Sequence, residues 1–370
     1  MWKFRDLADR LVSDGLVQSH RDFWTPEDPP AMVLSPPRGA GWQEDSQTGR
    51  MRPNPSGFTA RLLAGSRPSA VVACRGCASL ARSQQHFHCL LALWTSGGRG
   101  PRGPPDDWLL LAHDAEYCRG FLEGTLDAAR WRRIGFTQCS DYGALVRRTR
   151  LEVAGTVLAA RLALQRGLAC HTAGGTHHAH RSWGSGYTIL NDLAVAALLL
   201  LREGLVSRPL VCDLDVHQGD GTAEILAGEP RAFTFSVHCK DNFPFGFKGM
   251  SHLGADRSDL DVGLAAGTAD QGYFGALEAH LPCALDLHRP DLVLYDAGVD
   301  VHADDGLGRL GVSWGGLRRR EDVVLEACLS RKIPIVCVIG GGYDRSASRL
   351  SRRHSAVFHA AAAAWARHGL

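Results

Sequence analysis

Three carboxylates and one imidazole lie within the segment 213–222, which reads DLDVHQGDGT. The apolar residues just before it predict a buried parallel strand that ends in a loop. Because side chains alternate along a strand, Asp213, Asp215 and His217 point the same way. We expect Asp215 and His217 to bind a divalent metal, with Asp213 behind them. The simpler alternative is a strand-to-helix turn in which Asp220 is the N-cap.

Two adjacent histidines, His177 and His178, follow a second short apolar run and lie on a glycine-rich turn. A lone histidine is usually a packed core or surface residue. A tandem pair close to a candidate metal site favours general acid and base catalysis, because the pKa of imidazole lies near neutrality. Each ring needs a carboxylate to orient it, and Asp213 and Asp220 remain for this role once Asp215 binds the metal.

Two further predicted strands also end in residues suited to chemistry. The run 291–295 leads to Asp300, which we expect to be the third metal ligand. The run 333–339 leads to three glycines and Tyr343, whose phenol can donate a hydrogen bond to a developing oxyanion. Open α/β sheets bind ligands at the carboxyl ends of their strands, so polar clusters at four strand ends predict a single catalytic site.

Helical patterns alternate with these strands. The longest predicted helix spans residues 141–165 and is closed by Gly167, and Asn191 and Asp192 cap another that runs to Arg202. Further helices are predicted over residues 269–287, 315–330 and 344–367. This alternation predicts the α/β class, with a single doubly wound parallel sheet and helices on both faces.

The motifs together resemble the histone deacetylases of the arginase and deacetylase superfamily, most of all the class IV branch and the bacterial deacetylase-like hydrolases. The matching segments are His177-His178, Gly186-Tyr187 and residues 213–222, 242–245, 297–300 and 340–343. The likeness spans most of the chain apart from one insertion. It implies the arginase-deacetylase fold and a hydrolase of linear amide C–N bonds, with the N-acyl-lysine of a protein as substrate.

The resemblance implies metal ligands at named positions. Asp215, His217 and Asp300 are expected to bind Zn²⁺, and a set of carboxylates and imidazole also accepts Fe²⁺ or Co²⁺. A structural K⁺ is expected next to Asp213. The residues expected around it are Asp213, Asp215, His217, Ser236 and Val237.

The resemblance also implies catalytic roles. His177 pairs with Asp213 and His178 pairs with Asp220, and His178 is the expected general base, which afterwards protonates the leaving amine. Tyr343 is expected to polarise the scissile carbonyl and to stabilise the tetrahedral oxyanion. The residues expected to bind the acyl-lysine chain in a narrow tunnel are Gly186, Tyr187, Phe243 and Gly341.

Two other functions are consistent with these residues. A small-molecule amidohydrolase acting on acetylpolyamines or related N-acyl amines would keep every catalytic group and differ at the rim of the tunnel. A non-enzymatic scaffold would have lost turnover, but the intact ligand set, both histidines and Tyr343 argue against it. Ureohydrolase chemistry is disfavoured because a two-manganese site needs more carboxylates than these loops offer.

The composition limits the class of protein. With 370 residues, 45% of them hydrophobic, and 41 basic against 39 acidic residues, the chain can bury a large core and has no charge signature for nucleic acid. Its longest apolar run is far shorter than the ~20 residues that cross a membrane. Eleven scattered cysteines indicate reduced thiols. We expect a soluble intracellular protein of the nucleus or cytoplasm, with an organelle as the alternative, that acts on an acyl-lysine protein or a small N-acyl amine.

One long segment interrupts the pattern. Residues 1–28 and 105–370 are expected to form the catalytic domain, and residues 29–104 a basic, low-complexity insertion that we predict to be disordered. The residues with the spacing of a small zinc module are Cys74, Cys77, His86, His88 and Cys89. A flexible loop is favoured, because no second Cys-x-x-Cys accompanies them. Residues 246–257 form a smaller insertion beside the tunnel, and His171 has no assigned role.

Overall fold

A parallel sheet of seven strands is the centre of the computed structural model, which describes residues 2–16, 42–44, 51–53, 89–90, 104–136, 139, 141–244 and 258–370. In sheet order the strands are β3 (Cys89–Leu90), β4 (Leu168–His171), β9 (Ile335–Val338), β8 (Leu292–Asp296), β5 (Pro209–Asp213), β6 (Phe233–Cys239) and β7 (Leu260–Leu264). Each neighbouring pair is parallel. All residues of β4, β5, β8 and β9 are buried, as expected for strands that are covered on both faces.

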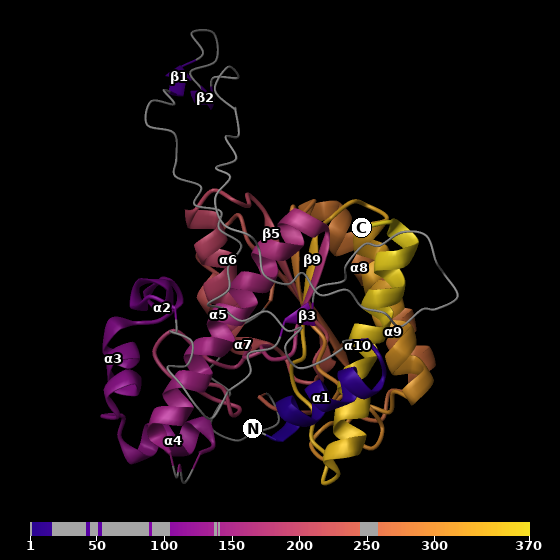
Figure 1. The fold of residues 1–370 in the computed structure, drawn as a ribbon, viewed down its shortest axis with the longest axis horizontal. Coiled ribbons are helices and arrows are strands. Elements are labelled where there is room, and N and C mark those ends of the chain that lie inside the picture. The colour runs from indigo at the N-terminus through magenta and orange to yellow at the C-terminus, as the bar shows by residue number, and fades with distance from the viewer. Residues whose placement is uncertain are drawn as a thin grey trace. The chain divides into compact units, whose positions relative to one another are not determined.

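Helices cover both faces of this sheet (Figure 1). On one face α8 (Asp270–His288), α9 (Trp314–Leu329) and α10 (Ala347–His368) pack on the sheet, and α1 (Trp2–Ser13) packs against α10. On the other, α5 (Tyr142–Arg166), α6 (Asp192–Arg202) and α7 (Asp220–Leu226) pack on the sheet, and α2 (Asp106–Ala112), α3 (Ala115–Glu123) and α4 (Ala128–Ile134) extend the same core outward. Successive strand residues alternate between the two cores, with Cys212 in the first and Val211 in the second. The predicted doubly wound α/β sheet is confirmed.

The predicted helices are present, with ends that differ by at most three residues. α5 begins where the Asp141 carboxylate accepts a hydrogen bond from the Ala144 N–H at 2.8 Å, and it ends at Gly167, whose φ is 88°. The side chain of Asn191 caps α6 in the same way. α10 begins later than predicted because Ser346 is its N-cap.

The long insertion is described only in part. Residues 28–71 form a separate unit, in which β1 (Trp42–Glu44) and β2 (Met51–Pro53) pair antiparallel. The candidate zinc-module residues Cys74, Cys77, His86 and His88 lie outside the described residues, and so does the smaller insertion 246–257. The boundaries and the order of the segment 29–104 stay predictions.

Two observations bear on the environment of the chain. Within the described part of the chain, no helix is long and apolar enough to cross a membrane. The described thiols include the buried side chains of Cys118, Cys170, Cys212, Cys239, Cys328 and Cys337, none of them in a disulfide. Burial raises the pKa of Cys328 to about 12, so this thiol stays protonated at neutral pH.

Candidate active site

Asp215, His217 and Asp300 lie together at the carboxyl ends of β5 and β8. These two strands are neighbours in the sheet, with Asp213 opposite Asp296, so the loops that follow them meet. The Nδ1 atom of His217 lies 3.0 Å from Asp215 Oδ1 and 3.3 Å from Asp300 Oδ2. All three side chains are buried, as a site that closes around a ligand requires. The structure therefore brings together the three residues that the sequence suggests as metal ligands.

The same three residues fit a divalent metal. Asp300 Oδ1 accepts a hydrogen bond from the Val216 N–H at 2.8 Å, whereas its Oδ2 is buried and, apart from the contact with His217 Nδ1 at 3.3 Å, makes no hydrogen bond with the described residues. A Cβ atom on Gly341 would lie 2.2 Å from that oxygen and 2.5 Å from Asp215 Oδ2, so a glycine is needed beside the cluster. Two carboxylates and an imidazole are ligands that both Zn²⁺ and Fe²⁺ accept.

The tandem histidines each contact a carboxylate, in the predicted pairs. His177 Nδ1 is 2.7 Å from Asp213 Oδ2, and His178 Nδ1 is 2.6 Å from Asp220 Oδ1. The N-cap of α7 is Gly219, so the alternative in which Asp220 serves as the helix cap is wrong. Because Nδ1 of each ring is engaged, Nε2 is the nitrogen left for proton transfer.

The two rings differ in their affinity for a proton. Burial would lower the pKa of His177, but the charges of Asp213 and Asp215 outweigh burial and raise this pKa well above its ordinary value. Burial and then the positive charge of His177 lower the pKa of His178 to about 4, against the opposing effect of Asp220. The ring centroids are 4.0 Å apart, so two charged rings would repel each other. At neutral pH, His178 is the ring that can accept a proton.

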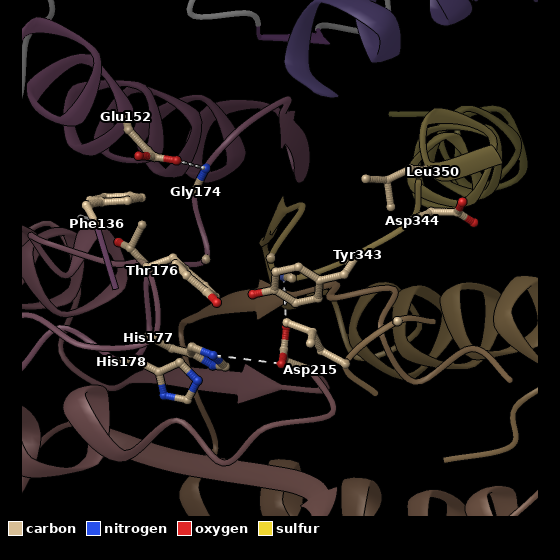
Figure 2. A pocket seen from close by; sticks show the side chains of 18 of the residues that line it. Phe136, Glu152, Gly174, Thr176, His177, His178, Asp215, Tyr343, Asp344 and Leu350 are labelled. Atoms are coloured by element: carbon tan, nitrogen blue, oxygen red, sulfur yellow. Dashed lines mark hydrogen bonds and ion pairs between the residues drawn. The ribbon is translucent and has the colours of Figure 1, made fainter. Parts of the chain in front are cut away.

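The histidine pair, Asp215 and Tyr343 line one cavity of about 660 Å³ (Figure 2). The ring of Tyr343 lies 6.4 Å from that of His217 between centroids. Figure 2 shows its hydroxyl directed toward the side of the cavity that carries the histidines. Burial and the carboxylates nearby raise the pKa of Tyr343 well above its ordinary value, so the phenol keeps its proton and can donate a hydrogen bond.

Three of the four predicted substrate-binding residues line this cavity: Gly186, Tyr187 and Gly341. Phe243 is not one of the lining residues, but its ring packs edge-on against His178 at 4.8 Å between centroids. A Cβ atom on Gly186 would lie 2.3 Å from the His178 ring, so a larger residue there would displace the histidine. Tyr187 is 49% exposed and forms part of the outer rim.

Two residues at the site had no role predicted from the sequence. Asp296 is fully buried and forms, with His177 and Asp213, a second group of side chains that are close enough to share an ion. Phe136 lines the cavity and packs against Tyr187 at 6.2 Å between ring centroids. The position of Asp296 at a strand end was a usable signal, whereas that of Phe136 in a loop after α4 was not.

His180 is a third residue that sequence reasoning missed. Its Nε2 lies 3.2 Å from Asp220 Oδ2 and its Nδ1 3.0 Å from Glu224 Oε2, so Asp220 lies between two imidazoles. The His180 ring stacks on Trp183 at 3.6 Å between centroids. Its position three residues after His177 carries no signal, because these contacts depend on where α7 lies.

The residues predicted around a monovalent cation are adjacent in the sheet. Ser236 on β6 is opposite Asp213 on β5, and Asp213 Oδ1 accepts a hydrogen bond from the Asp215 N–H at 3.1 Å. Ser236 and Val237 are buried. The hydroxyl of Ser236 also lies 3.0 Å from Nδ1 of His238, a buried histidine that the sequence did not single out.

We call residues 174–178 the histidine turn. His171 belongs to a buried polar network below this turn. Its Nδ1 is 3.1 Å from Thr156 Oγ1, which donates a hydrogen bond to Asp192 Oδ2 at 2.6 Å. Asp192 also accepts hydrogen bonds from the backbone N–H groups of Gly175 at 3.2 Å and Thr176 at 2.8 Å. The network therefore supports the backbone that carries His177 and His178.

Comparison with known proteins identifies the family. The sequence-family model of the histone deacetylase domain matches residues 78–360 of this chain. The chain belongs to the histone deacetylase family. It is 48% identical over 261 residues to an uncharacterised protein of Picosynechococcus sp., a match that covers 70% of this chain and 83% of that protein. It is 33% identical over 201 residues to histone deacetylase 2 of Arabidopsis thaliana, covering 54% of this chain and 51% of that protein.

Two solved structures share the fold. An acetylpolyamine aminohydrolase from Burkholderia pseudomallei superposes with a TM-score of 0.57 at 20% identity, over 72% of this chain and 85% of that one. The HD domain of HDA15 superposes with a TM-score of 0.53 at 24% identity, over 71% and 75%. The arginase-deacetylase fold is thereby confirmed. Because it is a member of the histone deacetylase family, the chain is a hydrolase that acts on amide bonds.

Proposed function

We propose that this chain is a metal-dependent deacylase that hydrolyses the amide of N-acyl-lysine in proteins. The observation that carries the proposal is the convergence of His178, Asp215 and Tyr343 on one cavity. A proton acceptor, a metal ligand and a hydrogen-bond donor for an oxyanion are the groups that metal-assisted hydrolysis of an amide requires. Action on histones or other proteins, in the nucleus or the cytoplasm, is part of the same proposal.

The metal of the proposal is Zn²⁺, with Fe²⁺ as the alternative, held by Asp215, His217 and Asp300. When bound, such an ion lowers the pKa of water to roughly 7 and polarises a carbonyl group. The buried Asp300 oxygen that makes no hydrogen bond with the described residues apart from its contact with His217 supports this assignment. A structural K⁺ beside Asp213 is a separate part of the proposal, supported by the position of Ser236 across the strand pair.

The histidines and the tyrosine perform the proton transfers and stabilise charge. His178, oriented by Asp220, accepts a proton from the attacking water and donates it to the amine nitrogen as the C–N bond breaks. A C–O bond forms at the acyl carbon, and the products are a carboxylate and an amine. His177, whose charge Asp213 stabilises, favours the negative acyl oxygen, and Tyr343 donates a hydrogen bond to it.

The walls of the cavity fit a lysine side chain. Tyr187 offers an aromatic face at the rim, and the glycines Gly186 and Gly341 leave room for an unbranched methylene chain beside the catalytic groups. Asp304 favours the second candidate, a small acetylpolyamine. It lines the cavity with a side chain that is 77% exposed and lies 3.9 Å from Arg353 Nη2, and its carboxylate would also attract the second ammonium group of a polyamine.

The test is hydrolysis by the purified, zinc-loaded full chain of a panel of acyl-lysine peptides and acetylpolyamines, with a chelator-treated control. We expect chelator-sensitive turnover of the lysine peptides. Turnover of acetylpolyamines alone would assign the chain to the small-molecule class, and Asp304→Asn would then raise the KM for them. Absence of turnover on every substrate would contradict the proposed function.

A further inference from the structure

A buried arginine contacts both loops that carry the metal ligands. Arg320 on α9 is completely buried, and α9 packs on the sheet face opposite to α5, α6 and α7. Its Nη1 atom donates hydrogen bonds to the carbonyl oxygens of Leu214 at 3.0 Å and Gly298 at 2.6 Å. Its Nη2 atom donates to the carbonyl oxygen of Ala297 at 3.1 Å. We call residues 214–217 and 297–300 the metal loops.

The remaining N–H groups of Arg320 contact Glu321. Nη2 lies 2.7 Å and Nε 3.3 Å from Glu321 Oε1, so all five N–H groups of the guanidinium have a partner. The other oxygen of Glu321 accepts a hydrogen bond from the Tyr295 hydroxyl at 2.5 Å. The charge of Arg320 is therefore balanced by a carboxylate that is itself anchored on β8.

The carbonyl groups that Arg320 contacts are next to the metal ligands in sequence and in space. Leu214 immediately precedes Asp215, and Gly298 lies two residues before Asp300. A Cβ atom on Gly298 would lie 2.2 Å from Asp215 Oδ2, which shows how closely this backbone approaches the carboxylate. A shift of either loop would change the separation of the ligands. One guanidinium spans both loops and therefore holds this separation fixed.

We propose that Arg320 is a positioning residue that sets how tightly the metal loops bind a divalent ion. The inference rests on the metal of the proposed function, and it adds a residue that contacts neither the ion nor the substrate. Lysine cannot replace the arginine, because an ammonium has three donors and no planar fork with which to reach three carbonyl groups and a carboxylate. A residue that orients ligands in this way typically changes metal affinity by roughly 10- to 100-fold when it is altered.

The experiment compares Arg320→Lys with Arg319→Lys in the full chain. Arg319 is the neighbouring arginine on α9, 55% exposed and paired with Glu278, so its replacement serves as the matched control. Each protein is stripped of metal, and Zn²⁺ is titrated in competition with a chromophoric chelator. We expect the Kd for Zn²⁺ to rise about 10- to 100-fold in Arg320→Lys and to stay unchanged in the control.

Two further readouts separate positioning from general stabilisation. The visible absorption spectrum of the Co²⁺-loaded protein reports ligand geometry, and we expect it to change in Arg320→Lys alone. The rise in Tm that saturating Zn²⁺ produces should shrink in Arg320→Lys, because ligand stabilisation depends on Kd. An equal loss of Tm with and without metal, together with an unchanged Kd, would overturn the proposal.

A second variant covers the case in which Arg320→Lys does not fold. Glu321→Gln keeps a side chain of the same shape and removes the negative charge that anchors Arg320. We expect a several-fold rise in the Kd for Zn²⁺, and an unchanged Kd in this variant would also overturn the inference. If the wild-type chain itself binds none of Zn²⁺, Fe²⁺ and Co²⁺, the proposed function fails first, and the result is distinguishable from a failure that concerns Arg320 alone.

Discussion

The histidine turn and the metal loops are supported from opposite faces of the sheet by groups of opposite charge. The carboxylate of Asp192 on α6 accepts hydrogen bonds from backbone N–H groups of the histidine turn. The guanidinium of Arg320 on α9 donates to the carbonyl groups of the metal loops. The turn directs N–H donors into the interior, and the loops direct carbonyl acceptors there. The donors are satisfied by a buried carboxylate and the acceptors by a buried guanidinium. We call the metal loops with their ligands the metal half of the site, and the histidine turn with the residues that contact its histidines the histidine half. The comparison predicts that these two halves can be damaged separately.

Asp215→Ala should have the largest effect, because it damages the metal half directly. We expect both turnover and bound metal to be lost, since one of three ligands is removed together with the acceptor for the Gly341 N–H at 2.8 Å. Metal analysis of the purified variant and a peptide assay give the two measurements. Retention of stoichiometric Zn²⁺ by this variant would show that Asp215 is not a ligand.

His178→Ala should damage only the histidine half. We expect kcat to fall about 10²- to 10⁴-fold, the usual loss when a general acid or base is removed, while the Kd for Zn²⁺ stays unchanged. His178 lies 2.6 Å from Asp220 and contacts no proposed ligand at bonding distance, which is why metal affinity should survive. A variant that loses metal along with activity would break the separation between the two halves.

Tyr343→Phe tests the group that lies between the halves. Removal of the hydroxyl deletes one donor to the oxyanion, so kcat should fall about 10²- to 10³-fold with little change in KM or Tm. Steady-state kinetics and thermal unfolding measure these quantities. Full activity in this variant would eliminate the proposed oxyanion role, because Phe keeps the aromatic packing and removes the donor alone.

Asp192→Asn should weaken the support of the histidine turn. Each carboxylate oxygen of Asp192 accepts hydrogen bonds, Oδ1 from Thr176 and Oδ2 from Thr156 and Gly175, and an amide can accept on one side only. We expect the free energy of unfolding to fall by about 1–3 kcal/mol, with a lower kcat and an unchanged Kd for Zn²⁺.

The control for this change is Asp107→Asn at an exposed aspartate, which should leave the free energy of unfolding and kcat as they are. Asp192→Asn and Arg320→Lys then form a matched pair, because the Kd for Zn²⁺ should stay unchanged in the first and rise in the second. A change of metal affinity in the Asp192 variant would mean that the support of the histidine turn also controls the metal loops, and the two halves would no longer be independent.

The sequence predicts the catalytic groups better than it predicts their supports. The strand ends that carry Asp215, Asp300 and Tyr343 can be located from local patterns, because the carboxyl ends of parallel strands meet at one edge of a sheet. Arg320 cannot be found in this way, since it lies 106 positions after Leu214 in the sequence and its surroundings read as an ordinary helix. Only the packing of α9 on this face of the sheet brings it to the metal loops.

Asp296 and His180 were missed for related reasons. The strand end marks Asp296 as a candidate, but its place beside Asp213 depends on β8 and β5 being neighbours, an order that no local signal encodes. His180 gains its partners from α7, which packs beside the turn. The folded chain thus adds second partners to residues that the sequence had already paired, as Asp220 shows by contacting both His178 and His180.

His180 gives the smallest expected effect and a test of the histidine half by pH. Burial lowers the pKa of His180, but its contacts with Asp220 and Glu224 outweigh burial and raise the pKa to about 9. The folded value lies above the ordinary value of 6.5, so the stabilising contribution is fully present below pH 6.5 and is lost as the pH rises through about 9.

The difference in unfolding free energy between wild type and His180→Gln should therefore be larger at pH 6 than at pH 10, as measured by urea unfolding at each pH. The neutral His180 ring still packs against Trp183, so part of the difference should remain at pH 10. Glu224→Gln should reduce the pH dependence, because it removes one of the two carboxylates that favour the charged ring. A difference that is constant from pH 6 to pH 10 would show that His180 acts in the histidine half through packing and not through its charge.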